Sequence, residues 1–143
     1  MWNELKHHFE GHSQDLIEVI YEDITPEIWT TLFHWLDGKI SHLMTKDGYD
    51  DVSTLSLESF LSGDCSYVVT LISTDERMPL ELSIIDDELL EINIELEEIQ
   101  SAAEFELYLK TVTEIATVIQ STNYYICPEY KKDESFMING KLV

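Results

Sequence analysis

The sequence predicts an α+β fold, in which a mainly antiparallel β-sheet is packed by helices on one face. The first observation is the strict alternation of apolar and polar residues in "LLEINIELEEI", residues 89–99, which is typical of a half-buried antiparallel strand. A similar segment, residues 80–85, precedes it across a short acidic loop, and together they predict a hairpin. Residues 26–36 and 101–122 instead repeat apolar side chains at helical spacing. This mixture of helices with an antiparallel hairpin defines the α+β class.

Size and charge narrow the possible functions. The chain has 143 residues, 44% of them hydrophobic, which is enough for one domain over residues 1–143. Its net charge is −21, from 29 acidic and 8 basic residues. Such a charge disfavours binding to nucleic acid phosphates or to anionic membranes. Residues 1–14 lack the features of a secretory signal, and no apolar run is long enough for a membrane span. We therefore expect a cytoplasmic protein that binds neither nucleic acid nor membrane.

The first half of the chain contains one helix with clear boundaries. Thr25 is suited to the N-cap of a helix over residues 26–36, Pro26 to its first position and Gly38 to its end. The other elements expected here are a short helix ending at Gly11, a strand over 15–23, a short strand from 39, a turn over 46–53 and a short helix or irregular segment over 55–63.

The register of the acidic hairpin follows from its apolar residues. A two-residue loop of Asp86 and Asp87 would place Leu82 opposite Glu91 and interrupt the apolar face. A three-residue loop that includes Glu88 instead pairs apolar residues with one another. The predicted pairs are Ile84 with Leu90, Leu82 with Ile92 and Leu80 with Ile94. The opposite face then gathers Glu81, Ser83, Glu91, Asn93, Glu95 and Glu97.

The second half is predicted to hold the longest helix. Ser101 is a suitable N-cap, and Glu104 completes a capping box three residues later. A strand over 65–73 and a loop precede the hairpin, and two short strands, 123–130 and 134–143, follow the helix. The expected buried stripe of the helix is Phe105, Tyr108, Leu109, Val112, Ile115, Ala116 and Ile119.

Recognisable catalytic and metal-binding motifs are not found in the sequence, and we expect no enzyme, no cofactor and no metal. His8 and His12 have a spacing that can bind a metal on a helix, but Gly11 lies between them, so these two and His7 are interpreted as surface residues. Cys65 and Cys127 are interpreted as reduced, buried thiols. Cys127 would be a candidate nucleophile only if a histidine approached it in space.

The strongest functional signal is the acidic hairpin, because residues 78–109 contain no lysine or arginine. Like charges on neighbouring strands repel one another and slightly destabilise a sheet. These carboxylates serve either solubility or electrostatic docking of a basic protein. The candidate partner-binding residues are Glu81, Asp86, Asp87, Glu88, Glu91, Glu95, Glu97 and Glu98.

Three segments carry a resemblance to a known group of proteins. These are "YEDITPEIWTTLFHWL", the acidic hairpin, and "YLKTVTEIATVIQSTNYYICPEY". In overall plan the chain resembles small, acidic bacterial immunity proteins that neutralise contact-dependent or polymorphic toxins. The resemblance implies a cytoplasmic inhibitor without catalysis, which binds a basic toxin domain, often a nuclease, and blocks its active site with carboxylates.

Two alternative functions, from other classes of protein, remain open. One is a nucleic-acid mimic of the antirestriction type, in which rows of carboxylates replace phosphates; it requires acids spread over an elongated surface. The other is an uncharacterised small-ligand domain or enzyme. Its pocket would be lined by some of Trp2, Trp29, His34, Trp35 and Tyr49.

Overall fold

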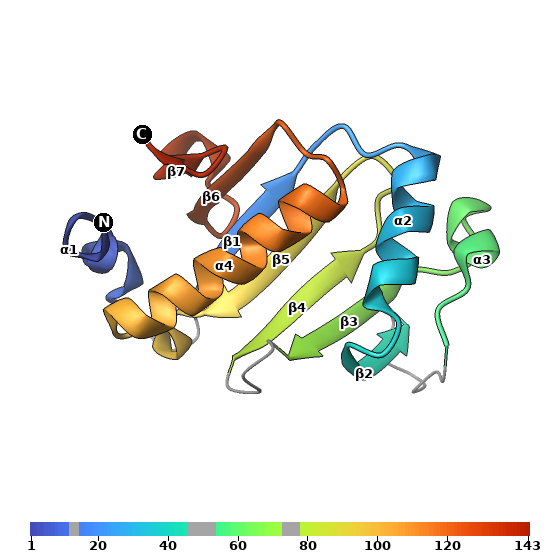
Figure 1. Cartoon of the computed structure of the whole chain (residues 1–143), viewed down its shortest axis with the longest axis horizontal. Coiled ribbons are helices and arrows are strands. Elements are labelled where there is room, and N and C mark those ends of the chain that lie inside the picture. The colour runs from blue at the N-terminus through green and yellow to red at the C-terminus, as the bar shows by residue number, and fades with distance from the viewer. Residues whose placement is uncertain (12–14, 46–53, 73–77) are drawn as a thin grey trace.

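One antiparallel sheet organises the computed structural model of the chain, which describes residues 1–11, 15–45, 54–72 and 78–143 (Figure 1). The strands are β1 (Leu16–Tyr21), β2 (Ile40–Thr45), β3 (Tyr67–Ile72), β4 (Pro79–Ile84), β5 (Leu90–Glu95), β6 (Tyr124–Pro128), β7 (Met137–Ile138) and β8 (Lys141–Leu142). Their order across the sheet is β2-β3-β4-β5-β1-β6-β7-β8, and every paired neighbour is antiparallel. The predicted α+β class with a mainly antiparallel sheet is confirmed.

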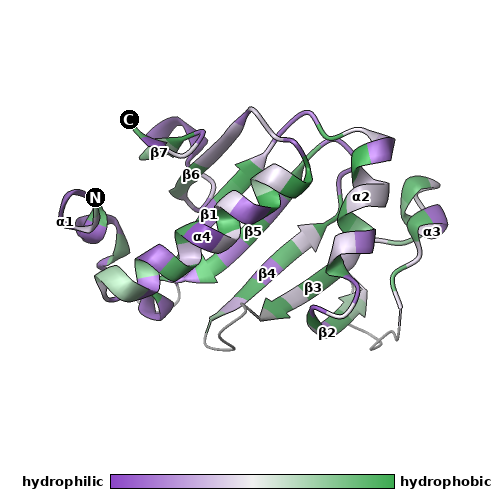
Figure 2. Cartoon of the chain, viewed as in Figure 1, coloured by the Kyte–Doolittle hydropathy of each residue, from purple (hydrophilic) through white to green (hydrophobic). Residues whose placement is uncertain are grey.

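Helices pack against one face of this sheet, where α4 crosses β1 and β5 and α2 lies over the β3 side (Figure 1). The helical elements are α1 (Trp2–Leu5), η1 (Lys6–Phe9), α2 (Pro26–Leu36), α3 (Leu57–Leu61), η2 (Leu96–Glu98), α4 (Ala102–Val118) and η3 (Lys132–Glu134). The core forms between these helices and the sheet because alternate residues of each strand point toward them. Figure 2 shows the resulting alternation of hydrophobic and hydrophilic residues along β4.

The hairpin of β4 and β5 has the predicted register. Leu82 lies opposite Ile92, and Glu81 and Ser83 lie opposite Asn93 and Glu91. Leu82 and Ile92 are fully buried, as the apolar face requires. The strands end at Ile84 and Leu90, so the connecting segment is longer than the predicted three-residue loop while the pairing is the same.

The two long helices begin where the sequence predicts. Thr25 is the N-cap of α2, although its hydroxyl makes no capping hydrogen bond, and the φ of +79° at Gly38 suits a glycine just after the helix. At α4 the Glu104 N–H donates to Ser101 Oγ at 3.2 Å. The Glu104 carboxylate accepts from the Gln100 N–H at 3.0 Å, one residue earlier than in a standard capping box. The predicted stripe of α4 is buried except for Leu109, which is half-buried.

Other predictions are corrected at the two ends of the chain. The opening helix is α1 followed by the 3-10 turn η1. The last ten residues contain β7 and β8, joined by a turn at Asn139 and Gly140, where one strand was predicted. The positive φ angles of these two residues fit an Asn-Gly hairpin turn. The turn predicted over 46–53 lies outside the described residues.

Candidate functional site

The sheet face opposite α2 and α4 carries a continuous row of side chains from six strands. Strand pairing places Glu18 of β1 between Cys127 of β6 and Asn93 of β5. Asn93 is followed by Glu81 of β4, and the row continues through Thr70 and His42. Successive residues of a strand point to opposite faces, and Ile17, Val19 and Tyr21 of β1 belong to the helix-side core. Glu18 therefore points to the other face.

Carboxylates from neighbouring rows surround Glu18. Glu91 pairs with Ile20, two residues along β1 on one side, and Glu95 pairs with Leu16 on the other. The Glu129 N–H donates to the Leu16 carbonyl at 3.1 Å, which extends the pairing of β6 and places Glu129 on the same face. We call this set the acidic sheet face: Glu18, Glu81, Glu91, Glu95 and Glu129.

Glu18 is the most deeply placed of these acids, with only 5% of its surface exposed. Within the described residues, neither a hydrogen bond nor an ion pair engages its carboxyl group. Its neighbour Asn93 is also incompletely paired, because Oδ1 of Asn93 is fully enclosed and has no hydrogen-bond partner there. Buried polar groups are normally hydrogen-bonded, so two adjacent unpaired acceptors are unusual.

This environment changes the protonation of the acids. Burial, with the charges of Glu91 and Glu129 adding to it, raises the pKa of Glu18 to about 7. The pKa of Glu91 is raised as well, first by burial and then by the charges of Asp86 and Glu129. Both shifts arise first from burial and then from the like charges nearby, and no adjacent cation among the causes offsets them.

Two lysines that follow β6 are paired with acids outside the acidic sheet face, Lys131 with Glu134 and Lys132 with Glu22. Lys132 Nζ donates to Glu22 Oε2 at 2.9 Å and lies 4.4 Å from the ring centroid of Tyr125. Lys132 slightly favours the ionised form of Cys127, yet burial and the charge of Glu18 dominate and raise the pKa of that thiol to about 11. A thiol with this pKa is protonated at neutral pH, which is the opposite of an activated nucleophile.

The eight candidate partner-binding residues fall into three groups. Glu81, Glu91 and Glu95 lie on the acidic sheet face, with Glu91 half-buried and the other two exposed. The second group lies in the turn before β5 and the third on η2 at the far end of β5. The turn holds Asp86, Asp87 and Glu88, and η2 holds Glu97 and Glu98.

The acidic turn is fixed to the helix layer by backbone hydrogen bonds. Trp29 Nε1 donates to the Asp87 carbonyl at 2.7 Å, and the Ile24 N–H donates to the Glu88 carbonyl at 3.0 Å. The Asp86 side chain accepts from the Glu88 N–H at 2.8 Å. These bonds hold the backbone of the turn at the α2 end of the hairpin, where its three acidic residues are exposed.

Sequence reasoning missed Glu18 and Glu129. The available signal for Glu18 was a single acid inside the otherwise apolar run "LIEVIY". An acid enclosed by apolar residues in a strand buried on both faces is a candidate functional group, because burial of a charge is otherwise unfavourable. Glu129 carried no such signal, since it follows Pro128 in a polar segment.

His7, His8 and Cys65 are not among the paired strand residues that form the row through Glu18. The His7 and His8 ring centroids lie 4.0 Å apart with the rings tilted by 39°, and His8 stacks on Phe136 at 4.2 Å. The predicted metal partner His12 lies outside the described residues. Cys65 is half-buried and Cys127 buried, and both are free thiols. The prediction that both thiols are buried is thus wrong for Cys65.

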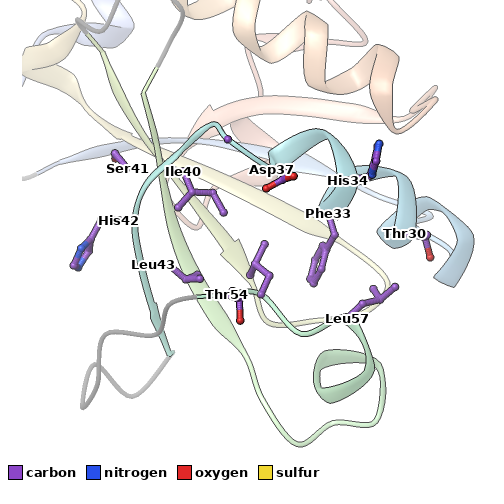
Figure 3. A pocket seen from close by; sticks show the side chains of 12 residues that line it. Thr30, Phe33, His34, Asp37, Ile40, Ser41, His42, Leu43, Thr54 and Leu57 are labelled. Carbon is purple, nitrogen blue, oxygen red and sulfur yellow. The ribbon is translucent and has the colours of Figure 1, made fainter.

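A hollow of about 710 Å³ lies between α2, β2 and the segment before α3 (Figure 3). Phe33 and Ile40 point toward each other across it, and the polar side chains at its edge include His34 and Asp37 (Figure 3). The tryptophans expected in a ligand pocket do not line it. Trp29 is fully buried in the core, whereas Trp2 packs against Phe9 and Phe105, and the Lys39 ammonium lies over Trp35.

Comparison with known proteins adds one structural neighbour. No protein-family model and no curated protein matches this chain. Its fold is similar to a chain of the 1.75 Å crystal structure described as the toxic C-terminal tip of CdiA from Pseudomonas aeruginosa in complex with immune protein. The TM-score is 0.61, with 17% sequence identity over 90% of this chain and 97% of that chain. In the part of this chain that the structure describes, no helix is long and apolar enough to cross a membrane.

Proposed function

We propose that this chain is a cytoplasmic, non-catalytic inhibitor of the immunity type, which binds a basic toxin domain through its acidic sheet face. The observation that carries the proposal is the cluster of carboxylates around Glu18, which lacks cationic partners within the described residues. A basic protein would supply those partners, and complementary charge both accelerates association and selects the partner. The acidic turn and η2 would extend the same interaction along the hairpin.

The structural neighbour supports a place in a toxin–immunity pair, and the charge of this chain favours the inhibitor's role over the toxin's. A net charge of −21 opposes contact with nucleic acid or with an anionic membrane, which are common targets of toxins. An inhibitor of a basic domain needs the opposite charge to that domain. The acidic sheet face meets this requirement.

Growth protection tests the proposal. The toxin domain encoded beside the gene for this chain is expressed in bacteria together with the wild type, Glu91→Lys/Glu95→Lys or Glu106→Lys/Glu114→Lys. The last variant reverses two exposed acids of α4, on the opposite side of the molecule, and so controls for net charge. We expect protection by the wild type and the α4 variant and loss of protection by the sheet-face variant. Growth arrest by this chain alone, or equal protection by all three proteins, would contradict the proposal.

A further inference from the structure

We propose that Glu18 and Asn93 form the floor of a receptor for a single arginine side chain of the partner protein. Glu91 and Glu129 form its rim. The inference rests on the proposed function, because it assigns one chemical group of the partner to one point of the acidic sheet face. The residue at its centre, Glu18, lies on β1 outside the acidic hairpin and is among the least exposed acids of the described residues.

The first argument is that the floor contains acceptors without donors. The Glu18 carboxyl and Asn93 Oδ1 belong to directly opposed residues of β1 and β5, and neither has a hydrogen-bond partner in the described residues. Leaving a buried acceptor unpaired is unfavourable, because the group loses its hydrogen bonds to water and gains none in return. A donor from a partner would satisfy the Glu18 carboxyl, which is not fully enclosed.

The second argument concerns access. Two side-chain polar atoms are both fully enclosed and unpaired in the described residues, Asn93 Oδ1 and Tyr108 Oη. The Glu18 carboxyl also lacks a hydrogen-bond partner, but its oxygens are not fully enclosed. Its remaining contact with solvent is small, since 5% of the residue's surface is exposed. The neighbouring Ser83 and Glu91 are half-buried.

The third argument selects the ligand. The acceptors come from β1, β5 and the end of β6, and neighbouring strands lie about 4.8 Å apart. A divalent metal needs its oxygen ligands to converge within about 2.5 Å of one point, and no such group of acidic, histidine or cysteine side chains occurs in the described residues. A guanidinium group is planar and offers five donors in a fixed fork, so it can reach several separated acceptors at once.

The charges that face Glu18 favour the same ligand. Glu91 and Glu95 flank it from β5, Glu129 and the Cys127 thiol from the β6 side, and the ammonium of Lys132 is held by Glu22. Burial is the main cause of the raised pKa of Glu18, and the charges of Glu91 and Glu129 add to it. An arginine placed on the floor would reverse the effect and lower the pKa of Glu18.

The test observes Glu18 directly in the intact chain. The pH titration of the Glu18 side-chain carboxyl carbon is followed by NMR while N-acetyl-arginine amide is added. N-acetyl-citrulline amide is a neutral control of the same shape, and calcium chloride is a metal control. We expect the arginine derivative to lower the Glu18 midpoint by about one pH unit or more at saturation. The citrulline derivative and calcium should leave the midpoint unchanged.

Two variants complete the experiment. In Glu18→Gln the chemical-shift changes that the arginine derivative causes around Asn93 should disappear. In Glu106→Gln, which removes an exposed acid of α4 on the other side of the sheet, they should persist. An unchanged Glu18 midpoint, a response to calcium instead, or identical arginine-induced changes in both variants would overturn the inference. The result is independent of growth protection. Arginine binding at Glu18 without protection would refute the proposed function alone, and protection through the sheet face without a response of Glu18 would refute the receptor alone.

Discussion

The phenol of Tyr21 donates a hydrogen bond of 2.7 Å to the backbone carbonyl of Val112, which joins the central strand β1 to the helix α4. Both residues are fully buried. Tyr21→Phe removes this bond and little else, so we expect the free energy of unfolding to fall by about 1 kcal/mol. Chemical denaturation measures the change.

The same substitution at Tyr108 should have a different effect. Tyr108 is also fully buried, but its hydroxyl has no partner in the described residues, and burial strongly raises its pKa. Tyr108→Phe removes an unsatisfied polar group, so we expect stability to be unchanged or to rise by about 1 kcal/mol. A loss of stability equal to that of Tyr21→Phe would mean that the Tyr108 hydroxyl does have a partner.

The inward face of the hairpin is tested at Ile92, which is fully buried opposite Leu82. Ile92→Ala should lower the free energy of unfolding by about 2–5 kcal/mol. Ile85→Ala is the control, because Ile85 is 39% exposed at the end of β4 and should change stability little. An unmoved midpoint in Ile92→Ala would contradict the assigned face.

We also expect fluorescence and circular dichroism to give one shared unfolding midpoint for the wild type, as one domain over residues 1–143 requires.

The stability of the protein should depend on pH through Glu18. Folding raises its pKa from 4.5 to about 7, mainly by burial, so the folded protein holds a proton that the unfolded chain releases. The stability that Glu18 contributes is therefore complete below pH 4.5 and is lost as the pH rises through 7, by at most about 3 kcal/mol.

Glu18→Gln has no charge to bury and should lack this loss. Unfolding of both proteins is measured from about pH 4.5 to about pH 8, and the difference between them isolates Glu18 from the other acids. Glu81→Gln controls for the removal of one negative charge from the same face. A constant difference between wild type and Glu18→Gln across this range would show that Glu18 is solvated in the folded protein.

Sequence patterns predicted the hairpin and the two long helices because their signals are local. Strict alternation along residues 90–96 determines which side chains face the core, and matching the apolar faces determines the register. At α4, Ser101 and the apolar stripe set the start and the buried side together. The C-terminal β7–β8 hairpin was missed because its strands are too short for an alternation signal, although Asn139-Gly140 is a recognisable turn.

The centre of the candidate site could not be predicted in the same way. Glu18 is buried because β1 lies between β5 and β6, and the residues paired with Glu18, Asn93 and Cys127, are more than seventy positions away in the sequence. A local pattern places Glu18 on a strand, but it does not show that another strand pairs with each edge of that strand. The acids of β5 were identified because they alternate with apolar residues along the strand. Their proximity to Glu18 and Glu129 depends on the order of the strands in the sheet.

The measurement that tests the central claim most directly is the association rate with the basic toxin domain at low and high salt. Wild type is compared with Glu91→Lys/Glu95→Lys and with the α4 control Glu106→Lys/Glu114→Lys. Interactions between exposed charges are screened over roughly 8 Å at physiological ionic strength, so salt should slow association wherever the acidic sheet face guides it. We predict a strong salt dependence for wild type and the α4 control, and slower, nearly salt-independent association for the sheet-face variant. Equal rates and equal salt dependence for all three proteins would contradict docking through the acidic sheet face.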